Sequence, residues 1–530
     1  MGSTDRSNLT FSCGICVLLL IPVTLFIVSL FIRPAVGLDP SWGFLAFRSM
    51  LEGGSFNSVT APDPANIAKD VEVFLSWWSP GQYLIPGIFV WFGTDYGLAI
   101  SVTTLLATVI GVIGWAQVAR NFDVPCSILF LFIFGLVTFR YITIPFLLYN
   151  GGEVLLFAVS PWSLYALQKV VDKPAAACLA ISLLSAALLF LAKLTGLVAF
   201  TANIVAISLV DVVKRRRVTS SLLAIWAGSA IAALFFLIFW LAWGRVPATP
   251  VVPWWSASWP GFAFTWLAIW FPMVGATFSG ISGLDFLSGL FLRPSGLIKI
   301  YVLGPLGLLL MGWVWFRLRS TRYRSMAVCL FSIIAIYAAA FVVMYVRGAA
   351  ISFEERHLRY AGILFLLLML VAINQWRESL AKAVTILIVG SFAVYGLTSY
   401  VNIAREFMRG RHYDPVSGVS MRIVSPVVLE YLRSEMAVQK WQDAIAVVPS
   451  PEAAIGLPRF RIIEVHVDFS SLEEIAAGKK WAGRVEKVFV MVRETMRGNG
   501  KAEALLRLFV DYDIEKWRQI QLDGMIVYSQ

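Results

Sequence analysis

The chain has 530 residues, of which 59% are hydrophobic and only 14% are charged, and its mean hydropathy is +0.77. About a quarter of the residues in an ordinary globular chain are charged, so this composition excludes a soluble enzyme and predicts a polytopic integral membrane protein. The net charge of +11 does not indicate nucleic-acid binding. From Val401 onward, 18 Lys and Arg face 17 Asp and Glu, so the excess belongs to the apolar part of the chain.

Eleven apolar runs recur between residues 13 and 400. A helix needs about 20 residues to cross roughly 30 Å of hydrocarbon, and the runs approach or exceed that length. They predict an α-helical polytopic membrane fold with about eleven transmembrane helices. Two pieces rich in Gly, Pro and Trp, at 82–93 and 259–291, are typical of helices lying in the membrane interface. The predicted spans are 13–32, 96–119, 125–139, 153–170, 175–192, 196–213, 220–243, 298–316, 326–346, 360–375 and 381–400.

The basic loops between these runs predict an orientation, because Lys and Arg near span ends are retained on the cytoplasmic side. Fourteen such residues fall on one side of the alternating spans, which places the N-terminus in the cytoplasm and the chain after Val401 outside a plasma membrane of bacterial type. The first apolar run has no small-residue cleavage site and is predicted to be retained as a span. The basic positions are Arg6, Arg120, Lys169, Lys173, residues 214–217, the run Arg317 to Arg324, Arg377 and Lys382.

The apolar runs predict a division into a transmembrane domain, residues 1–402, and a small soluble α/β domain, residues 403–530. The first domain contains two long outer loops, 33–95 and 244–297, and the earlier loop is net acidic. Loops on a rigid scaffold often carry the chemistry. The tail predicts helices at 426–433, 471–477 and 500–510, and strands at 444–448, 462–467, 488–493 and 525–528.

The first outer loop begins Gly37-Leu38-Asp39-Pro40-Ser41-Trp42, directly after the first span. Asp39 therefore lies at the boundary between membrane and water. One interpretation is structural, because Asp followed by Pro before an apolar stretch is a good helix N-cap with Pro at the first helical position. The other is a functional carboxylate.

Three segments in order resemble a known family. They are the first span with Asp39 at its outer end, followed by the W-W-S-P-G-Q-Y segment from Trp77 to Tyr83; the tight outer turn Ala192 to Leu197; and the charged loop Glu354 to Tyr360. This layout resembles the polyprenyl-phosphate-sugar-dependent glycosyltransferases of the C-type (GT-C) fold, which include protein mannosyltransferases and aminoarabinose transferases. The resemblance covers roughly residues 13–400.

The resemblance implies that Asp39 is the catalytic base of an inverting sugar transfer. A glycosidase needs a second carboxyl group to protonate its leaving group, whereas a polyprenyl phosphate leaves as a stable anion. One base and a cationic clamp on the phosphate are then sufficient. The sugar would pass to an envelope lipid, glycan or protein at the outer face. Candidates for the clamp are Arg356, Arg359 with Tyr360, Lys69 and Arg293, unless these cations pair with acidic neighbours or headgroups.

Glu153 is a second candidate acid, at the outer end of the fourth predicted span. The family often has such an acid, which contacts the acceptor or a metal; the alternative is a helix-start carboxylate favoured by the helix dipole. Lys193, at the outer end of the fifth span, is a candidate partner for it. The family commonly has paired acids in the first loop, but in this sequence Pro40 follows Asp39. Dependence on a divalent metal is therefore left open. His357, which lies beside two Glu, is a further candidate metal ligand.

Trp77 and Trp78 belong to a set of outer tryptophans that suits an interfacial aromatic belt, or alternatively stacking on a sugar or prenyl chain. Two other functions are compatible with the composition. A transporter or flippase of a lipid-linked glycan would show charges in mid-span and inverted repeats, and neither is seen. A non-catalytic subunit that keeps the fold is the other alternative.

Overall fold

The structure of the protein is a computed structural model that describes residues 3–243, 259–278, 296–347, 355–376, 378–410, 412–439, 443–465 and 470–530. The chain forms two compact units. The first consists of residues 1–27, 104–146 and 152–402, and the second of residues 28–103, 147–151 and 403–530. In this division the first outer loop, predicted to belong to the transmembrane domain, is grouped with residues 403–530.

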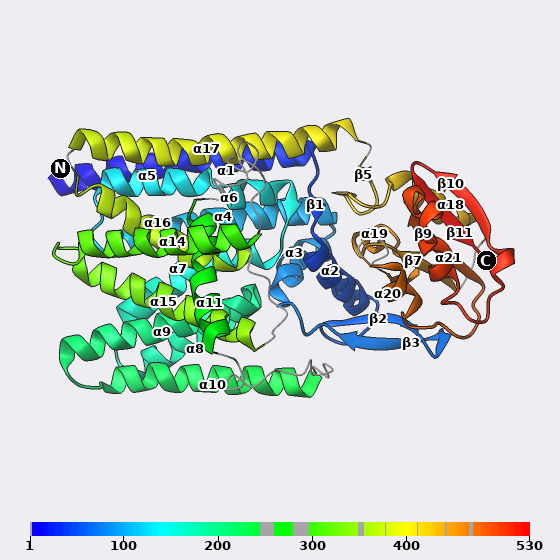
Figure 1. Ribbon diagram of the computed structural model, residues 1–530, viewed down its shortest axis with the longest axis horizontal. Coiled ribbons are helices and arrows are strands. Elements are labelled where there is room, and N and C mark those ends of the chain that lie inside the picture. Colours follow the sequence, from blue (N-terminus) through cyan, green and yellow to red (C-terminus); the bar gives the residue numbers. More distant parts are fainter. Residues whose placement is uncertain are drawn as a thin grey trace. The chain divides into compact units, whose positions relative to one another are not determined.

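Long helices make up the first unit, and each of the eleven predicted apolar runs is occupied by a helix (Figure 1). They lie side by side, in the manner of a helical membrane bundle. The helices that carry these runs are α1 (Ser3–Phe31), α4 (Tyr96–Asn121), α5 (Cys126–Val137), α7 (Gly152–Val170), α8 (Ala175–Ala192), α9 (Leu194–Arg215), α10 (Ser220–Trp243), α14 (Gly296–Leu318), α15 (Arg324–Val346), α16 (Glu355–Ile373) and α17 (Glu378–Arg409).

Eight helices in the described ranges are long and apolar enough to cross a membrane, and nine if α5 is counted with the short helix pair after it. That pair, α6 (Arg140–Thr143) and η1 (Ile144–Phe146), is bent by 53° from α5. The helix α7 is not among the eight, and for α14 only Gly304–Leu318 enters the test, as a shorter apolar helix. The pieces expected in the interface are the short helices α3 (Gly81–Trp91), α11 (Trp259–Ala268) and α12 (Trp270–Thr277), whereas 279–291 lies outside the described residues.

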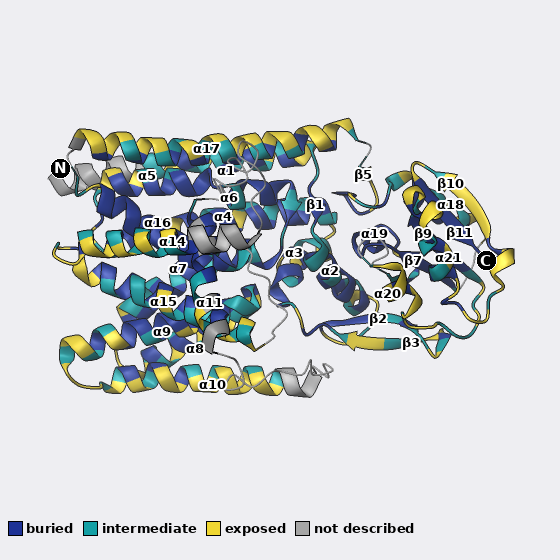
Figure 2. Ribbon diagram, in the orientation of Figure 1, coloured by how far each residue is buried: buried dark blue, intermediate teal, exposed yellow. Residues whose placement is uncertain are grey.

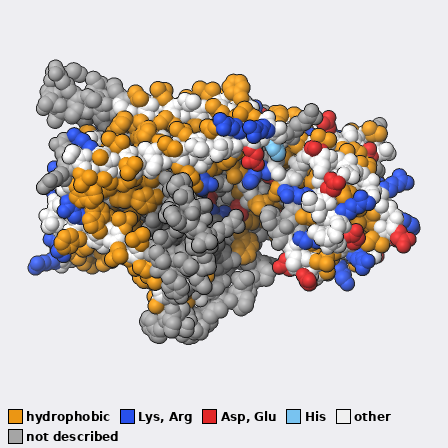
Figure 3. Space-filling model, turned by 45° about the horizontal axis from the view of Figure 1, so that its top comes forward, with side chains coloured by type: hydrophobic (Ala, Val, Ile, Leu, Met, Phe, Trp, Pro, Cys, Tyr) orange, Lys and Arg blue, Asp and Glu red, His pale blue; other side chains and the backbone are white. Residues whose placement is uncertain are grey.

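Burial distinguishes the interior of the helical unit from its lipid-facing surface. The helices α15 and α16 are largely buried, whereas α10 and α17 expose long apolar faces (Figure 2). Phe235 of α10 is 70% exposed and Leu387 of α17 is 71% exposed. Apolar patches of this extent are rare on soluble monomers, so these faces are suited to lipid. Figure 3 shows a related contrast on one face, where hydrophobic side chains gather over the helices and charged side chains of both signs are scattered over the C-terminal domain.

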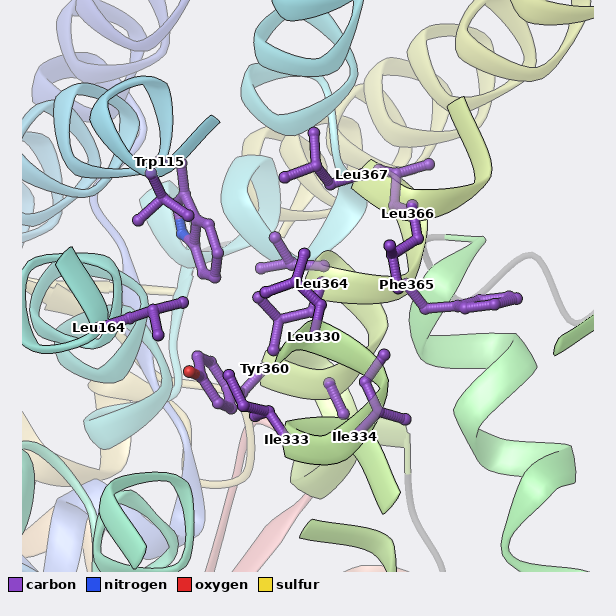
Figure 4. Close-up of a cluster of buried hydrophobic side chains, with 14 of the residues drawn as sticks. Trp115, Leu164, Leu330, Ile333, Ile334, Tyr360, Leu364, Phe365, Leu366 and Leu367 are labelled. Atoms are coloured by element: carbon purple, nitrogen blue, oxygen red, sulfur yellow. The ribbon is translucent and has the colours of Figure 1, made fainter. Parts of the chain in front are cut away.

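A dense core fills the centre of the helical unit. Trp115 of α4, Leu164 of α7, Ile333 of α15 and Tyr360 of α16 point toward one another, and all four are almost fully buried (Figure 4). Side chains from four helices thus interlock at one level, which fixes the positions of the helix ends that they support.

The second unit begins with a small sheet of order β4-β1-β6-β5. Strand β1 (Ala35–Val36) pairs in parallel with both β4 (Leu148–Tyr149) and β6 (Val419–Ser420), and β6 pairs antiparallel with β5 (Tyr413–Asp414). Three segments far apart in sequence are thereby hydrogen-bonded to one another. The sheet holds the chain in place immediately before α2 (Leu38–Leu51).

A β-hairpin follows α2, formed by β2 (Ser58–Asp63) and β3 (Asn66–Phe74). It packs against the C-terminal domain, where the amide of Ile67 donates to the carbonyl of Ala482 at 2.8 Å. Arg48 of α2 donates to the carbonyls of Ala454, Leu457, Pro458 and Phe460. These contacts join the first outer loop and the tail into one unit.

The C-terminal domain is the predicted α/β domain, built on a five-stranded sheet of order β10-β11-β9-β7-β8. The strands β7, β8 and β9 are parallel, and β11 pairs antiparallel with β9 and β10. The helix predicted at 500–510 ends earlier, and the strand β10 was not predicted. The elements are α18 (Pro426–Gln439), β7 (Ala444–Val448), α19 (Glu452–Ile455), β8 (Arg461–Glu464), α20 (Leu472–Ala476), β9 (Lys487–Arg493), α21 (Lys501–Leu506), β10 (Arg518–Leu522) and β11 (Met525–Ser529).

Candidate functional site

Glu153 lies in the first turn of α7, where the helix dipole favours a carboxylate. Its side chain is only 7% exposed. The preceding residue must be small, because a Cβ on Gly152 would lie 2.5 Å from the carbonyl oxygen of Ala192. This close approach brings the start of α7 against the end of α8.

Lys193 lies between α8 and α9 in an extended conformation that ends one helix and begins the next. Its ammonium donates to Glu153 Oε1 at 2.8 Å, and its side chain is 15% exposed. The predicted pairing of these two residues is confirmed. A carboxylate and an ammonium buried together in this way offset much of each other's desolvation cost.

Arg356 and Arg359 lie three residues apart in the first turns of α16, so their side chains leave the same face of the helix. The guanidinium of Arg359 lies over the ring of Tyr141, 3.7 Å from its centroid. The hydroxyl of Tyr141 donates to Glu355, the first residue of α16. Both arginines also interact electrostatically with Glu153. The start of α16 is therefore fixed to α6 by Tyr141 and to α7 by charge.

Glu153, Arg356, Arg359 and Tyr141 line one cavity of about 400 Å³, part of it open to solvent. Lys193, Arg356 and Arg359 supply three positive charges in and beside it, and Glu153 and Glu355 supply two negative ones. Among these five described residues one positive charge is in excess, and a bound anion would be stabilised more in this poorly hydrated place than in water. The lining is Phe139, Tyr141, Ile142, Glu153, Leu156, Phe157, Ser160, Arg356, Arg359, Tyr360 and Ile363.

Tyr360 lines the cavity, but its hydroxyl donates to Asn203 Oδ1 at 2.6 Å. Its ring centroid lies 6.1 Å from that of Trp115 and 5.8 Å from that of Tyr337. These contacts make Tyr360 a packing residue that supports the arginine beside it. Tyr141 was not predicted as a site residue, because nothing in the local sequence distinguishes it from other interfacial tyrosines.

Asp39 belongs to the second unit and lies in the first turn of α2, half-buried. The interpretation of Asp39 as the helix cap is wrong, because α2 begins one residue earlier and Gly37 is its N-cap. The amide of Gly37 donates to the carbonyl of Tyr149 at 2.9 Å, and Pro40 is buried. Asp39 is thus held on a rigid helix start that the β1–β4 pairing anchors.

The described residues Lys69, Trp77 and Trp78 are not among those that line this cavity. Lys69 is exposed on β3, and its backbone carbonyl accepts a hydrogen bond from Arg461 at 2.8 Å. Trp77 is exposed and Trp78 is half-buried in the segment between β3 and α3. Both tryptophans belong, like Lys69, to the second unit. Arg293 lies outside the described residues.

A metal site would need several oxygen, nitrogen or sulfur ligands close together. Within the part of the chain that the structure describes, no three His, Cys, Asp or Glu side chains lie close enough to hold a metal ion. The backbone carbonyl of His357 accepts a hydrogen bond from Tyr337 at 2.7 Å, and its ring lies 6.0 Å from that of Phe341. The described residues thus provide no set of ligands around His357.

No protein-family profile matches the sequence, and no curated protein sequence matches it either. Solved structures do match the fold. The apo structure of ArnT from Cupriavidus metallidurans, an aminoarabinose transferase, is 13% identical with a TM-score of 0.56, over 98% of each chain. The structure of ArnT from the same organism bound to undecaprenyl phosphate is 12% identical with a TM-score of 0.53, over 97% of each chain. From end to end, the chain has the C-type glycosyltransferase fold.

Proposed function

We propose that this protein is a membrane glycosyltransferase that takes a sugar from a polyprenyl-phosphate donor and transfers it to an envelope lipid, glycan or protein. The observation that supports this most directly is the buried excess of positive charge at the start of α16. A phosphate is an anion with several acceptor oxygens, and arginine can bind two of them at once. The fold shared with ArnT adds support, since one ArnT structure contains undecaprenyl phosphate.

In this proposal, Arg359 and Arg356 bind the donor phosphate and stabilise the negative charge that develops as the sugar leaves. Glu153 does not act on the sugar itself. Its ion pair with Lys193 and its attraction for both arginines make it a positioning residue that holds the cations in the cavity without a bound donor. The electron pair of the sugar–phosphate bond goes to the phosphate, so no acid has to protonate the leaving group.

Asp39 is proposed as the general base. It removes the proton from an acceptor hydroxyl as the oxygen attacks the anomeric carbon, so that the new bond forms on the face opposite to the departing phosphate. The configuration at the anomeric carbon is then inverted. A carboxylate in the first turn of α2, which the β1–β4 pairing holds, has the fixed backbone that such a base needs.

The test is an Asp39→Asn substitution in purified protein reconstituted in membranes and supplied with a panel of polyprenyl-phosphate sugars. Consumption of the donor should fall by roughly 10²- to 10⁴-fold, the usual contribution of a general base. Asp63→Asn is the matched control, because Asp63 lies in the same outer loop, where its carboxylate accepts from the amide of Ala65 at 2.9 Å. Full activity in Asp39→Asn would remove Asp39 as the base. A wild-type protein that consumes no donor would favour a transporter or a non-catalytic subunit.

A further inference from the structure

A second cavity lies in the second unit, where the last turn of α1 and the last turns of α17 meet β5 and β6. We call it the α1–α17 groove; it encloses about 650 Å³, part of it open to solvent. Its lining combines one guanidinium with apolar side chains. The residues used below are Phe31, Arg33, Phe407, Met408, His412 and Ser420.

Arg33 has an incompletely satisfied guanidinium at this groove. Its Nη2 reaches Asp95 Oδ2 only at 3.4 Å, longer than an ordinary charge-assisted hydrogen bond. The other oxygen of Asp95 accepts from the amide of Leu98 at 2.7 Å and caps α4. The Nη1 of Arg33 is buried and has no hydrogen-bond partner among the described residues. A donor left without an acceptor is unfavourable, so a ligand that supplies further acceptors to this guanidinium would be favoured.

The backbone around Arg33 is fixed. Ser420 Oγ donates to the carbonyl of Arg33 at 2.6 Å, and the amide of Ser420 donates to the carbonyl of Pro34 at 3.0 Å. On the other side of the groove, the ring of His412 lies against that of Phe407, 5.9 Å between centroids. The backbone that carries Arg33 at the wall of the groove is therefore fixed without a ligand.

The edge of the groove is apolar and exposed. Phe31 is 83% exposed and Met408 is 63% exposed, and they lie at the ends of α1 and α17, which are both long and apolar enough to cross a membrane. This is the depth at which lipid headgroups give way to acyl chains. Arg409, also exposed, follows Met408. Among the described residues, Arg405 and Arg409 accompany Glu406 in the last turns of α17, and Arg33 is opposed by Asp95.

We infer that the α1–α17 groove binds an anionic glycerophospholipid. The lipid phosphate accepts from the guanidinium of Arg33, which lines the groove, and the first methylenes of the acyl chains cover Phe31 and Met408. Charge complementarity selects the anionic headgroup, and the exposed apolar edge at the end of two spans selects a lipid over a free phosphate. The inference does not depend on the proposed transferase activity, because no residue of the groove is assigned to that chemistry.

The test is native mass spectrometry of the full-length protein in detergent, titrated with phosphatidylglycerol or phosphatidylcholine. The first phosphatidylglycerol adduct should form at a lower lipid concentration than the first phosphatidylcholine adduct. Arg33→Gln should weaken that adduct by roughly tenfold or more, since a hydrogen bond to a charged group contributes about 1.5–3 kcal/mol. The matched control is Arg347→Gln, which removes an exposed arginine that follows α15 and lies outside the groove.

A second variant guards against misfolding of Arg33→Gln. Met408→Glu leaves the Arg33–Asp95 pair intact and places a carboxylate at the exposed edge, so it should also weaken the phosphatidylglycerol adduct. Equal binding of the two lipids, or an unchanged adduct in both variants, would overturn the inference. Displacement of the lipid by inorganic phosphate at equal concentration would also overturn it, because the groove would then be a site for free phosphate.

Discussion

Two half-buried arginines in different units of the protein differ in how many of their N–H donors have a hydrogen-bond acceptor. Arg48 of α2 uses all five of its N–H donors. Its Nε donates to Glu52 at 2.9 Å, and its two terminal nitrogens donate to four backbone carbonyls at 2.6–3.3 Å. Arg359 of α16 contacts the ring of Tyr141, but its buried Nε has no hydrogen-bond partner among the described residues.

The difference separates a structural arginine from one that is ready for a ligand. A fully bonded guanidinium has no donor left for a substrate and instead fixes the elements around it, in this case α2 and the loop after α19. A guanidinium buried with donors left over is costly on its own. It is expected where a ligand supplies the missing acceptors, at some cost to the stability of the ligand-free protein.

The largest expected effect is that of Arg359→Gln on activity. Loss of the fork that binds the donor phosphate should lower donor consumption by roughly 100-fold, equivalent to about 3 kcal/mol of transition-state stabilisation. The melting temperature should stay the same or rise, because the variant removes a buried charge that is not fully bonded. Both are measured on the purified protein, by donor consumption and by thermal unfolding.

Arg359→Lys sharpens this test. Lysine keeps the charge but cannot bind two phosphate oxygens in a plane, so it should recover only part of the activity. Arg347→Gln serves as the matched control for loss of an arginine. A large fall in melting temperature with Arg359→Gln would show that Arg359 is a structural residue like Arg48.

Arg48→Gln should have the opposite profile. It removes five hydrogen bonds, four of them between α2 and the C-terminal domain, and should lower the free energy of unfolding of the second unit by about 2–3 kcal/mol. Limited proteolysis should then cleave the C-terminal domain faster. Arg459→Gln is the control, an exposed arginine in the same loop. Unchanged proteolysis in Arg48→Gln would refute the anchoring role.

Part of the fold and of the candidate site could be predicted from the sequence, and part could not. Apolar length alone identified the helices, since only a helix satisfies its backbone within lipid. The pair of Glu153 and Lys193 was predictable, because two opposite charges at the outer ends of apolar runs have few other partners. Arg356 and Arg359 were predicted from a resemblance in the loop before α16, and they line the same cavity.

The role of Arg48 was not predictable, because its partners are backbone carbonyls that follow it by more than 400 residues and carry no side-chain signature. The β4-β1-β6-β5 sheet was missed for the same reason, and the β2–β3 hairpin was missed although its two strands are neighbours in the sequence. The strands of that sheet are two residues long, too short for an alternating pattern, and the tertiary contacts rather than local propensity form them. The assignment of the first outer loop to the C-terminal unit depends on these pairings.

The smallest expected effect is on the pH dependence of stability, and it comes from a buried carboxylate rather than an arginine. Glu153 has a buried cation, whereas Glu452 in the C-terminal domain accepts from two backbone amides, those of Arg422 at 2.9 Å and Ile423 at 2.7 Å. Glu452 is 3% exposed, and burial raises the pKa of its carboxyl to about 7, although the two amides act in the other direction. A folded-state pKa above the unfolded one means that the folded protein holds the proton more tightly.

The contribution of Glu452 to stability is therefore fully present below pH 4.5 and is lost as the pH rises through about 7. Glu452→Gln mimics the protonated form and still offers an oxygen to both amides. The wild-type melting temperature should thus fall by a few degrees more than that of the variant between pH 5 and pH 8, which corresponds to roughly 2 kcal/mol. Other titrating groups act on both proteins alike, so the difference between the two curves isolates Glu452. If the melting temperatures of the two proteins change with pH in parallel, the amides of Arg422 and Ile423 stabilise the ionised carboxylate of Glu452 as well as Lys193 stabilises that of Glu153.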